Sequence, residues 1–221
     1  MILHYDWETS GLFINGVPSN DPKQPHGLSL SAVLDDDQGI TRRVLSVLIK
    51  PHEFQVDERT VGDDGRPTAY AVNGISNALL ARYATSLERA MIEFAHMIEQ
   101  ADILSAFNHH FDHKFVKIGC ARMPKDALRT GEEIRALLAT KSAVCTMEAA
   151  ANHLIGKKRI SLKNAYFELF KEETQTERYH GSLSDAMASR RIYYELKRRG
   201  ALPAPKPLAE RAYDTPYQPA A

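Results

Sequence analysis

The stretch that decides the fold is ILHYDWETSGL, residues 2–12. Side chains alternate between the two faces of a β-strand, so Leu3, Tyr5 and Trp7 share one face while Asp6 and Glu8 share the other. Two carboxylates on one face repel each other unless a cation lies between them, and hard divalent cations such as Mg²⁺ prefer carboxylate oxygen. An edge strand with a solvated acidic face is the alternative, so the interpretation depends on residues downstream.

The composition indicates an ordinary soluble globular protein. The 221 residues suit one domain, 43% of them are hydrophobic, and Lys plus Arg equals Asp plus Glu at 28 each. A net charge of zero argues against a broad basic surface that coats nucleic acid. Cys120 and Cys145 form no CxxC pair and are expected to be buried free thiols. The absence of a long apolar run or signal peptide predicts a cytoplasmic protein without membrane association.

The pattern along the chain predicts an α/β fold with a mixed five-stranded sheet. Three antiparallel strands (the first within the strand and turn of 2–12, then 27–35 and 43–49) precede βαβ units whose strands lie at 103–107 and 143–146, and helices flank the sheet. A capping box at Thr85–Glu88 opens a helix that ends near Gln100. Further helices are expected at 70–76, from residue 108, at 147–155, at 161–170 and at 182–199. Five prolines after residue 200 predict a domain of residues 1–199 and a surface or disordered tail of residues 200–221.

Two more carboxylates are candidate site residues. Asp112 lies in the first turn of a helix that directly follows a buried strand, where the helix dipole alone could stabilise it. Asp185 lies at the end of an apparent capping box that begins at Ser182, yet it shares a helical face with apolar positions 188, 192 and 196. A carboxylate directed at a core needs a partner, and a shared metal ion would supply one.

Three motifs carry a resemblance to a known family. Residues 6–12 match Asp-x-Glu-Thr-x-Gly-Leu, residues 108–112 match Asn-x-x-Phe-Asp, and residues 180–186 match His-x-Ala-x-x-Asp-Ala. In their order and spacing the chain resembles the DnaQ-like, or DEDD, family of 3′–5′ exonucleases in its histidine-bearing subgroup, across residues 1 to about 199. Phe107 and Asn73 stand where relatives commonly carry histidine, and Ser182 replaces the common alanine. Gly181 excludes the tyrosine-bearing subgroup.

The resemblance implies an RNase H-like fold, two Mg²⁺ or Mn²⁺ ions, and hydrolysis of phosphodiester bonds at the 3′ end of single-stranded DNA or frayed duplex, releasing 5′-mononucleotides. His180 would be the general base that takes a proton from the attacking water. The implied metal ligands are Asp6, Glu8, Asp112 and Asp185. The implied substrate-binding residues are Thr9, Gly11, Leu12, Phe13 and Asn108, with Leu12 or Phe13 against a base and Gly11 allowing a close turn.

Other interpretations stay open at this point. The same residues serve enzymes that trim RNA 3′ ends, and a non-catalytic polymerase-accessory or nucleic-acid-binding module is a different class. A polymerase or replication partner, in proofreading or repair, is a further expectation. His109 and His113 have the i, i+4 spacing of zinc ligands and, with His110 and Asp112, offer another site. The basic loop 157–159 either meets phosphates or is simply solvated.

Overall fold

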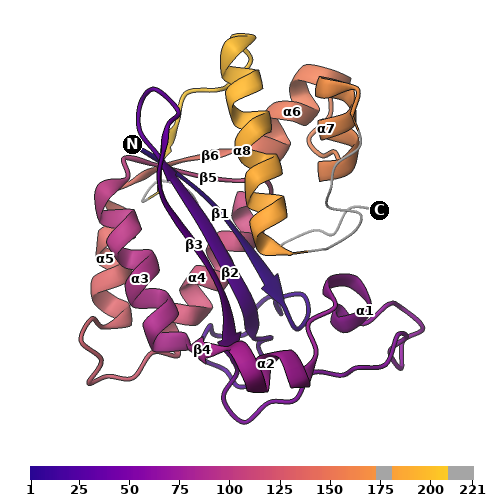
Figure 1. Ribbon diagram of the computed structural model, residues 1–221, viewed down its shortest axis with the longest axis vertical. Coiled ribbons are helices and arrows are strands. Elements are labelled where there is room, and N and C mark those ends of the chain that lie inside the picture. The colour runs from indigo at the N-terminus through magenta and orange to yellow at the C-terminus, as the bar shows by residue number, and fades with distance from the viewer. Residues whose placement is uncertain (173–180, 209–221) are drawn as a thin grey trace.

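The computed structural model describes residues 1–172 and 181–208. Its sheet has the strand order β4-β3-β2-β1-β5-β6-β7 (Figure 1). Strands β1 (Ile2–Thr9), β2 (Gly27–Asp35) and β3 (Thr41–Lys50) are antiparallel, and β5 (Ile103–Ala106) and β6 (Ser142–Cys145) continue in parallel on the other side of β1. These are the five predicted strands. Two strands of two residues each, β4 (Thr85–Ser86) and β7 (Lys206–Pro207), extend the sheet at its ends.

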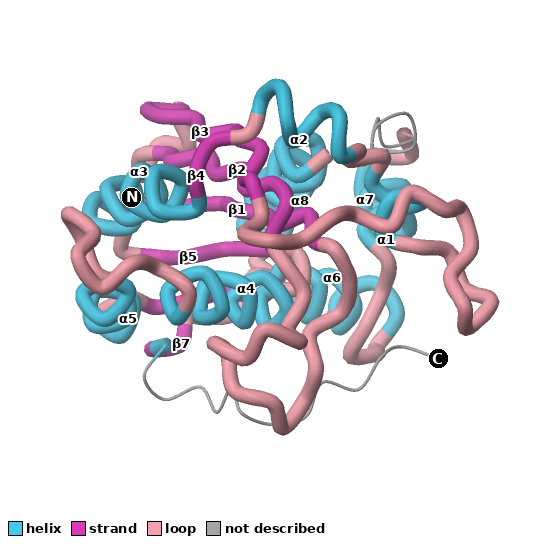
Figure 2. The backbone as a smooth tube through the Cα atoms, turned by 90° about the horizontal axis from the view of Figure 1, so that it is seen from below, coloured by secondary structure: helices cyan, strands magenta, loops and turns pink. Residues whose placement is uncertain are grey.

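Helices cover both faces of the sheet. They are α1 (Ala69–Asn73), α2 (Asn77–Tyr83), α3 (Leu87–Gln100), α4 (His109–Ala121), α5 (Gly131–Ala139), α6 (Thr146–Ile155), α7 (Leu162–Phe170) and α8 (Ser182–Arg198). As predicted, Leu3, Tyr5 and Trp7 share a buried face, and α3, α4 and α5 pack on it. Helix α8 lies across the opposite face of β1 (Figures 1 and 2). Strand β1 is therefore enclosed between α4 and α8. None of the described helices is both long and apolar enough to cross a membrane.

Two helices were not predicted, and one cap was misplaced. Helices α2 and α5 both fall in stretches that the sequence analysis left unassigned. The cap of α3 is Ser86 and not the predicted Thr85: the Ser86 hydroxyl accepts from the Arg89 N–H, and α3 begins one residue later than predicted. A capping box is present instead at α5, where Thr130 and Glu133 satisfy each other's backbone N–H groups.

The first part of the Pro-rich tail differs from the expectation of a segment that does not pack. Strand β7 pairs with β6, and the Leu208 N–H donates to the Lys141 carbonyl at 2.8 Å. Leu208 is buried in the main core. Proline is tolerated on an edge strand because its missing N–H faces away from the neighbouring strand. The open edge of β6 thus holds a segment that has little strand propensity of its own. Residues 209–221 lie outside the described residues.

A buried polar network fixes α8 to the β2–β3 hairpin. Asp35 is fully buried and accepts from Arg190 Nε at 2.6 Å, from the Tyr194 hydroxyl at 2.9 Å and from the Thr41 hydroxyl at 2.9 Å. His4 Nε2 lies 3.7 Å from the same carboxylate, but burial lowers the pKa of His4 to about 3. His4 is therefore neutral near pH 7, and Arg190 supplies the counter-charge of Asp35. If α8 slid along the sheet, the Asp35–Arg190 pair would break and leave the Asp35 carboxylate buried without a counter-charge. The cost of that step fixes the position of the helix.

Candidate active site

Three of the predicted carboxylates converge at the carboxyl end of β1. One carboxylate oxygen each from Asp6, Glu8 and Asp185 lies within 4.8 Å of the other two. Asp6 and Glu8 lie on the face of β1 that α8 covers, and Asp185 lies in the first turn of α8. The residue at the N-cap of α8 is Gly181, and no side chain caps this helix. Asp185 is therefore not the end of a capping box, and it is directed at the other two acids.

A cluster of serine hydroxyls holds the start of α8 against β2. The Ser182 hydroxyl lies 2.6 Å from that of Ser29 and 2.8 Å from that of Ser31, and all three residues are buried. Ser182 stands where the resemblance would place alanine, which could make neither bond. Because Asp185 follows three residues later in the helix, these bonds also fix the position of its carboxylate. The departure from alanine at position 182 therefore has a structural role, which the motif alone did not predict.

Asp112 lies beside the other three acids and is bonded to the backbone of β1. Its Oδ1 accepts from the Trp7 N–H at 3.1 Å, at the residue between Asp6 and Glu8. It is buried in the first turn of α4, which follows β5 directly. Asn108 precedes this helix, but its side chain makes no capping bond. The position of Asp112 therefore depends on strand β1 as well as on its own helix.

The carboxylates shift one another's proton affinity. Burial, followed by the charges of Asp112, Asp185 and Glu8, raises the pKa of Asp6 well above its usual value. Burial and Asp185 raise the pKa of Glu8 to about 7, which a hydrogen bond from Asn73 opposes. Burial raises the pKa of Asp112 to about 8, although the Trp7 N–H opposes the change. Such a set of oxygen donors favours either protons or divalent cations, so these residues fit the metal ions that the sequence predicts.

These pKa shifts predict how stability depends on pH in protein kept free of divalent cations by chelator. Because Glu8 and Asp112 bind protons more tightly when folded than when unfolded, the folded state holds more protons between about pH 4 and pH 8. The free energy of unfolding should therefore fall as the pH rises through this range. Thermal unfolding in the presence of chelator, at a series of pH values, measures this dependence. Added Mg²⁺ should raise the melting temperature more at pH 8 than at pH 5, because the carboxylates hold fewer protons at pH 8. A melting temperature that rises with pH in chelator would contradict these shifts, and so would a fall in Glu8→Gln as steep as in the wild type.

Asn73 is a site residue that the sequence analysis noted only as a departure. Its Nδ2 donates to the Thr9 carbonyl at 3.1 Å, and its Oδ1 accepts from the Ile75 N–H at 3.0 Å. It also bonds to the Glu8 side chain. Helix α1 ends at Asn73, and Gly74 follows with φ 68°, a left-handed conformation that suits glycine. A short helix far from β1 in sequence thus orients one of the acids.

The predicted substrate-binding residues after β1 have different environments. The Thr9 hydroxyl donates to the Gly11 carbonyl at 2.8 Å and closes the turn. Gly11 has no positive φ, and a Cβ there would meet its nearest neighbour only at 3.8 Å, so neither the backbone conformation nor a contact within the described protein requires glycine at this position. Leu12 is 58% exposed, whereas Phe13 is only 6% exposed and belongs to the core. Of the two residues expected to contact a base, Leu12 is thus the exposed one, whereas the Phe13 ring packs on His110 and Phe111 of α4.

The remaining predicted site groups are placed as follows. His180 lies outside the described residues. Within the described ranges, the one group of three or more His, Cys, Asp or Glu side chains with converging ligand atoms is that of Asp6, Glu8 and Asp185. His109 and His113 are instead buried with their rings stacked at 5.5 Å. The zinc interpretation therefore has no converging ligand set among these residues. Loop residues 157 and 158 are exposed, and Arg159 is partly buried.

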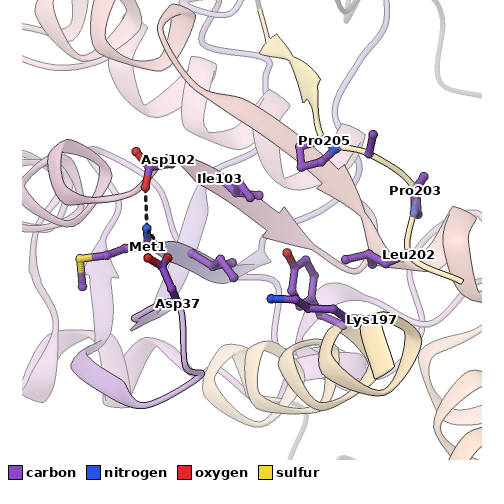
Figure 3. A pocket seen from close by; sticks show the side chains of 11 residues that line it. Met1, Asp37, Asp102, Ile103, Lys197, Leu202, Pro203 and Pro205 are labelled. Carbon is purple, nitrogen blue, oxygen red and sulfur yellow. Dashed lines mark hydrogen bonds and ion pairs between the residues drawn. The ribbon is translucent and has the colours of Figure 1, made fainter. Parts of the chain in front are cut away.

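A separate hollow of about 470 Å³ lies away from the carboxylates (Figure 3). It is lined by the start of β1, by Tyr193 and Lys197 of α8 and by residues 202–205 of the tail. In Figure 3 the amino group of Met1 points to Asp102, at 2.5 Å. Since Ile2 and Lys197 lie at the opposite ends of β1 and α8 from Asp6 and Asp185, this hollow is not part of the acidic site.

Solved exonuclease structures share this arrangement of strands and helices. A full-length 3′-exonuclease matches with a TM-score of 0.62 and 14% identity, over 90% of this chain and 61% of that one. E. coli Exonuclease I in complex with a dT13 oligonucleotide matches with a TM-score of 0.64 and 13% identity, over 90% and 41%. Exonuclease X in complex with 5′ overhanging duplex DNA matches with a TM-score of 0.53 and 20% identity, over 90% and 93%.

These similarities establish the fold, which is the predicted RNase H-like fold. No family model and no curated protein matches the sequence. This chain spans about three-fifths of the full-length 3′-exonuclease and less than half of Exonuclease I. The similarity therefore extends to the fold, and the substrate and activity of this chain are proposed below.

Proposed function

We propose that this protein is a divalent-metal-dependent 3′–5′ exonuclease that releases 5′-mononucleotides from single-stranded DNA or frayed duplex ends. The observation that carries the proposal is the convergence of Asp6, Glu8 and Asp185, with Asp112 beside them, on a fold that DNA-bound exonuclease structures share. Asp185 contributes to the raised pKa values of Asp6, Glu8 and Asp112, and such a group of acids serves no evident structural purpose at the end of a central strand. They suit a site that gathers cations around a phosphate.

Two Mg²⁺ or Mn²⁺ ions would balance the four carboxylates, two charges each. Asp6, Glu8, Asp112 and Asp185 would hold them. When bound, such a pair activates a water molecule and stabilises the charge on the leaving oxygen. The backbone N–H of Trp7 holds the Asp112 side chain toward β1, and a hydrogen bond from Asn73 orients the Glu8 side chain. These bonds reduce the reorganisation that the acids need when the ions bind.

His180 is the proposed general base, on the strength of the third motif. It precedes Asp185 by five residues, and an imidazole has a pKa suited to taking a proton near neutral pH. The terminal nucleotide would enter beside the turn closed by Thr9 and Gly11, with the exposed Leu12 against its base. A strand without a free end could not enter in this way. The predicted polymerase or replication partner stays a prediction.

The test is the product ladder from 5′-labelled single strands of DNA and RNA of one sequence, with Mg²⁺ or Mn²⁺ and with excess chelator. The proposal expects shortening from the 3′ end, no shortening in chelator, and an intact circular DNA strand. Cleavage of the circle would indicate an endonuclease, and hydrolysis in excess chelator would exclude the metal-ion mechanism. Faster shortening of RNA would favour the RNA-trimming alternative. Binding without hydrolysis under every condition would favour a non-catalytic module.

A further inference from the structure

The loop that follows β1 is anchored on α4 by Phe13. The buried Phe13 ring lies 5.8 Å from the His110 ring and 5.9 Å from the Phe111 ring. Two hydrogen bonds of 2.9 Å join the Ile14 backbone to the Gln24 side chain. The loop therefore holds a fixed position along the helix. Its two exposed apolar side chains, Leu12 and Ile14, stand on either side of the buried ring.

Positive charge gathers along the same side of α4. Lys114 and Lys117 follow His110 at i+4 and i+7, so the three side chains share one helix face. The Lys114 ammonium lies 6.0 Å from the centre of the Phe13 ring. Arg159, from the loop after α6, is close enough that it lowers the pKa of His110 together with Lys114 and Lys117, after the larger effect of burial. We call Lys114, Lys117 and Arg159 the cationic strip.

The strip adjoins the acidic site without being part of it. Asp112 lies on another face of the same helix, bonded to β1. Lys117 is five residues further on, about 7.5 Å along the helix axis. The chain as a whole has no net charge, so this concentration of cations results from where the fold places them. A polyanion that approaches four carboxylates needs such charges nearby, because the metal ions act only at the reacting phosphate.

We propose that the cationic strip binds the backbone phosphates of the nucleotides on the 5′ side of the scissile bond, while Ile14 packs against one of their bases and Leu12 stays with the terminal base. This binding role rests on the proposed function. It adds the expectation that the enzyme prefers substrates of several nucleotides to dinucleotides. Contacts of Lys and Arg with phosphates do not depend on sequence, and apolar side chains can pack on the face of any base. The preference should therefore be for length and not for sequence.

The test compares a triple variant, Lys114→Gln/Lys117→Gln/Arg159→Gln, with a control that removes three exposed charges elsewhere, Arg42→Gln/Lys197→Gln/Arg198→Gln. The substrates are an oligo-dT decanucleotide and the p-nitrophenyl ester of thymidine 5′-monophosphate, which has no phosphate upstream. In the triple variant, kcat/KM for the decanucleotide relative to that for the ester should fall at least about tenfold. The slope of log affinity against log salt should become shallower by about 2, from three lost phosphate contacts.

The proposal would be overturned if kcat/KM for the decanucleotide fell equally in the control variant. It would also be overturned if kcat/KM for the ester fell as much as that for the decanucleotide in the triple variant. The variant Lys114→Arg/Lys117→Arg keeps both charges and should retain the preference for long strands. If this variant loses the preference, packing and not charge is responsible. Anisotropy of labelled oligo-dT separates this proposal from the proposed function. The wild type could bind oligo-dT without hydrolysing either substrate, while of the two variants only the triple variant loses this binding. That result would support the cationic strip as a binding surface and contradict the proposed exonuclease activity.

Discussion

Replacing Asp185 by Asn should lower turnover by several orders of magnitude and weaken Mn²⁺ binding. The carboxylate oxygens of Asp6, Glu8 and Asp185 lie within 4.8 Å of one another. The amide removes one negative charge from this group and offers a single neutral oxygen as a ligand. Hard cations bind such a site less tightly because their affinity depends on the number of charged ligands. Turnover of a labelled strand and calorimetric titration of Mn²⁺ would measure the two effects.

The matched control for this experiment is Asp126→Asn, which makes the same chemical change at an exposed position. It should leave both quantities near the wild-type values. Asp6→Asn should behave like Asp185→Asn, because both acids belong to the converging group. If Asp185→Asn keeps the wild-type affinity for Mn²⁺, Asp185 is not a metal ligand and the proposed site is wrong.

Replacing His180 by Ala should lower kcat by roughly 10²–10⁴, the usual size of a general-base contribution. The affinity for Mn²⁺ should not change, since all four carboxylates remain. The same two measurements test this, with His96→Ala, an exposed histidine on α3, as the control. If His180→Ala loses Mn²⁺ as Asp185→Asn does, His180 is a ligand. If it keeps full turnover, another group takes the proton.

The elements that the sequence predicted are those whose signals are local. Alternation along β1 identified the buried face with Leu3, Tyr5 and Trp7 and the acidic face with Asp6 and Glu8, and both are present. Helix α5 also has a local signal, the Thr130 and Glu133 capping box, so it was predictable from the sequence although it was not predicted.

Other features depend on contacts between distant segments and could not be predicted locally. Phe13 and Leu12 are adjacent and both apolar, yet only Leu12 is exposed, because α4 covers Phe13. Strand β7 forms because β6 offers an unpaired edge, which the tail sequence does not reveal. Asn73 contacts Thr9 across more than sixty residues of chain. In each case the partner, and not the residue itself, decides the environment.

The acidic site joins the beginning of the chain to its last long helix. Asp6 lies in β1 and Asp185 in α8, so well over a hundred residues separate the two acids along the chain. Until α8 has been synthesised and docked through Ser182 and Arg190, the growing chain has an incomplete set of acids and binds cations weakly. A chain that lacks α8 therefore lacks one of the three converging acids, and the site can form only after α8 docks on β1.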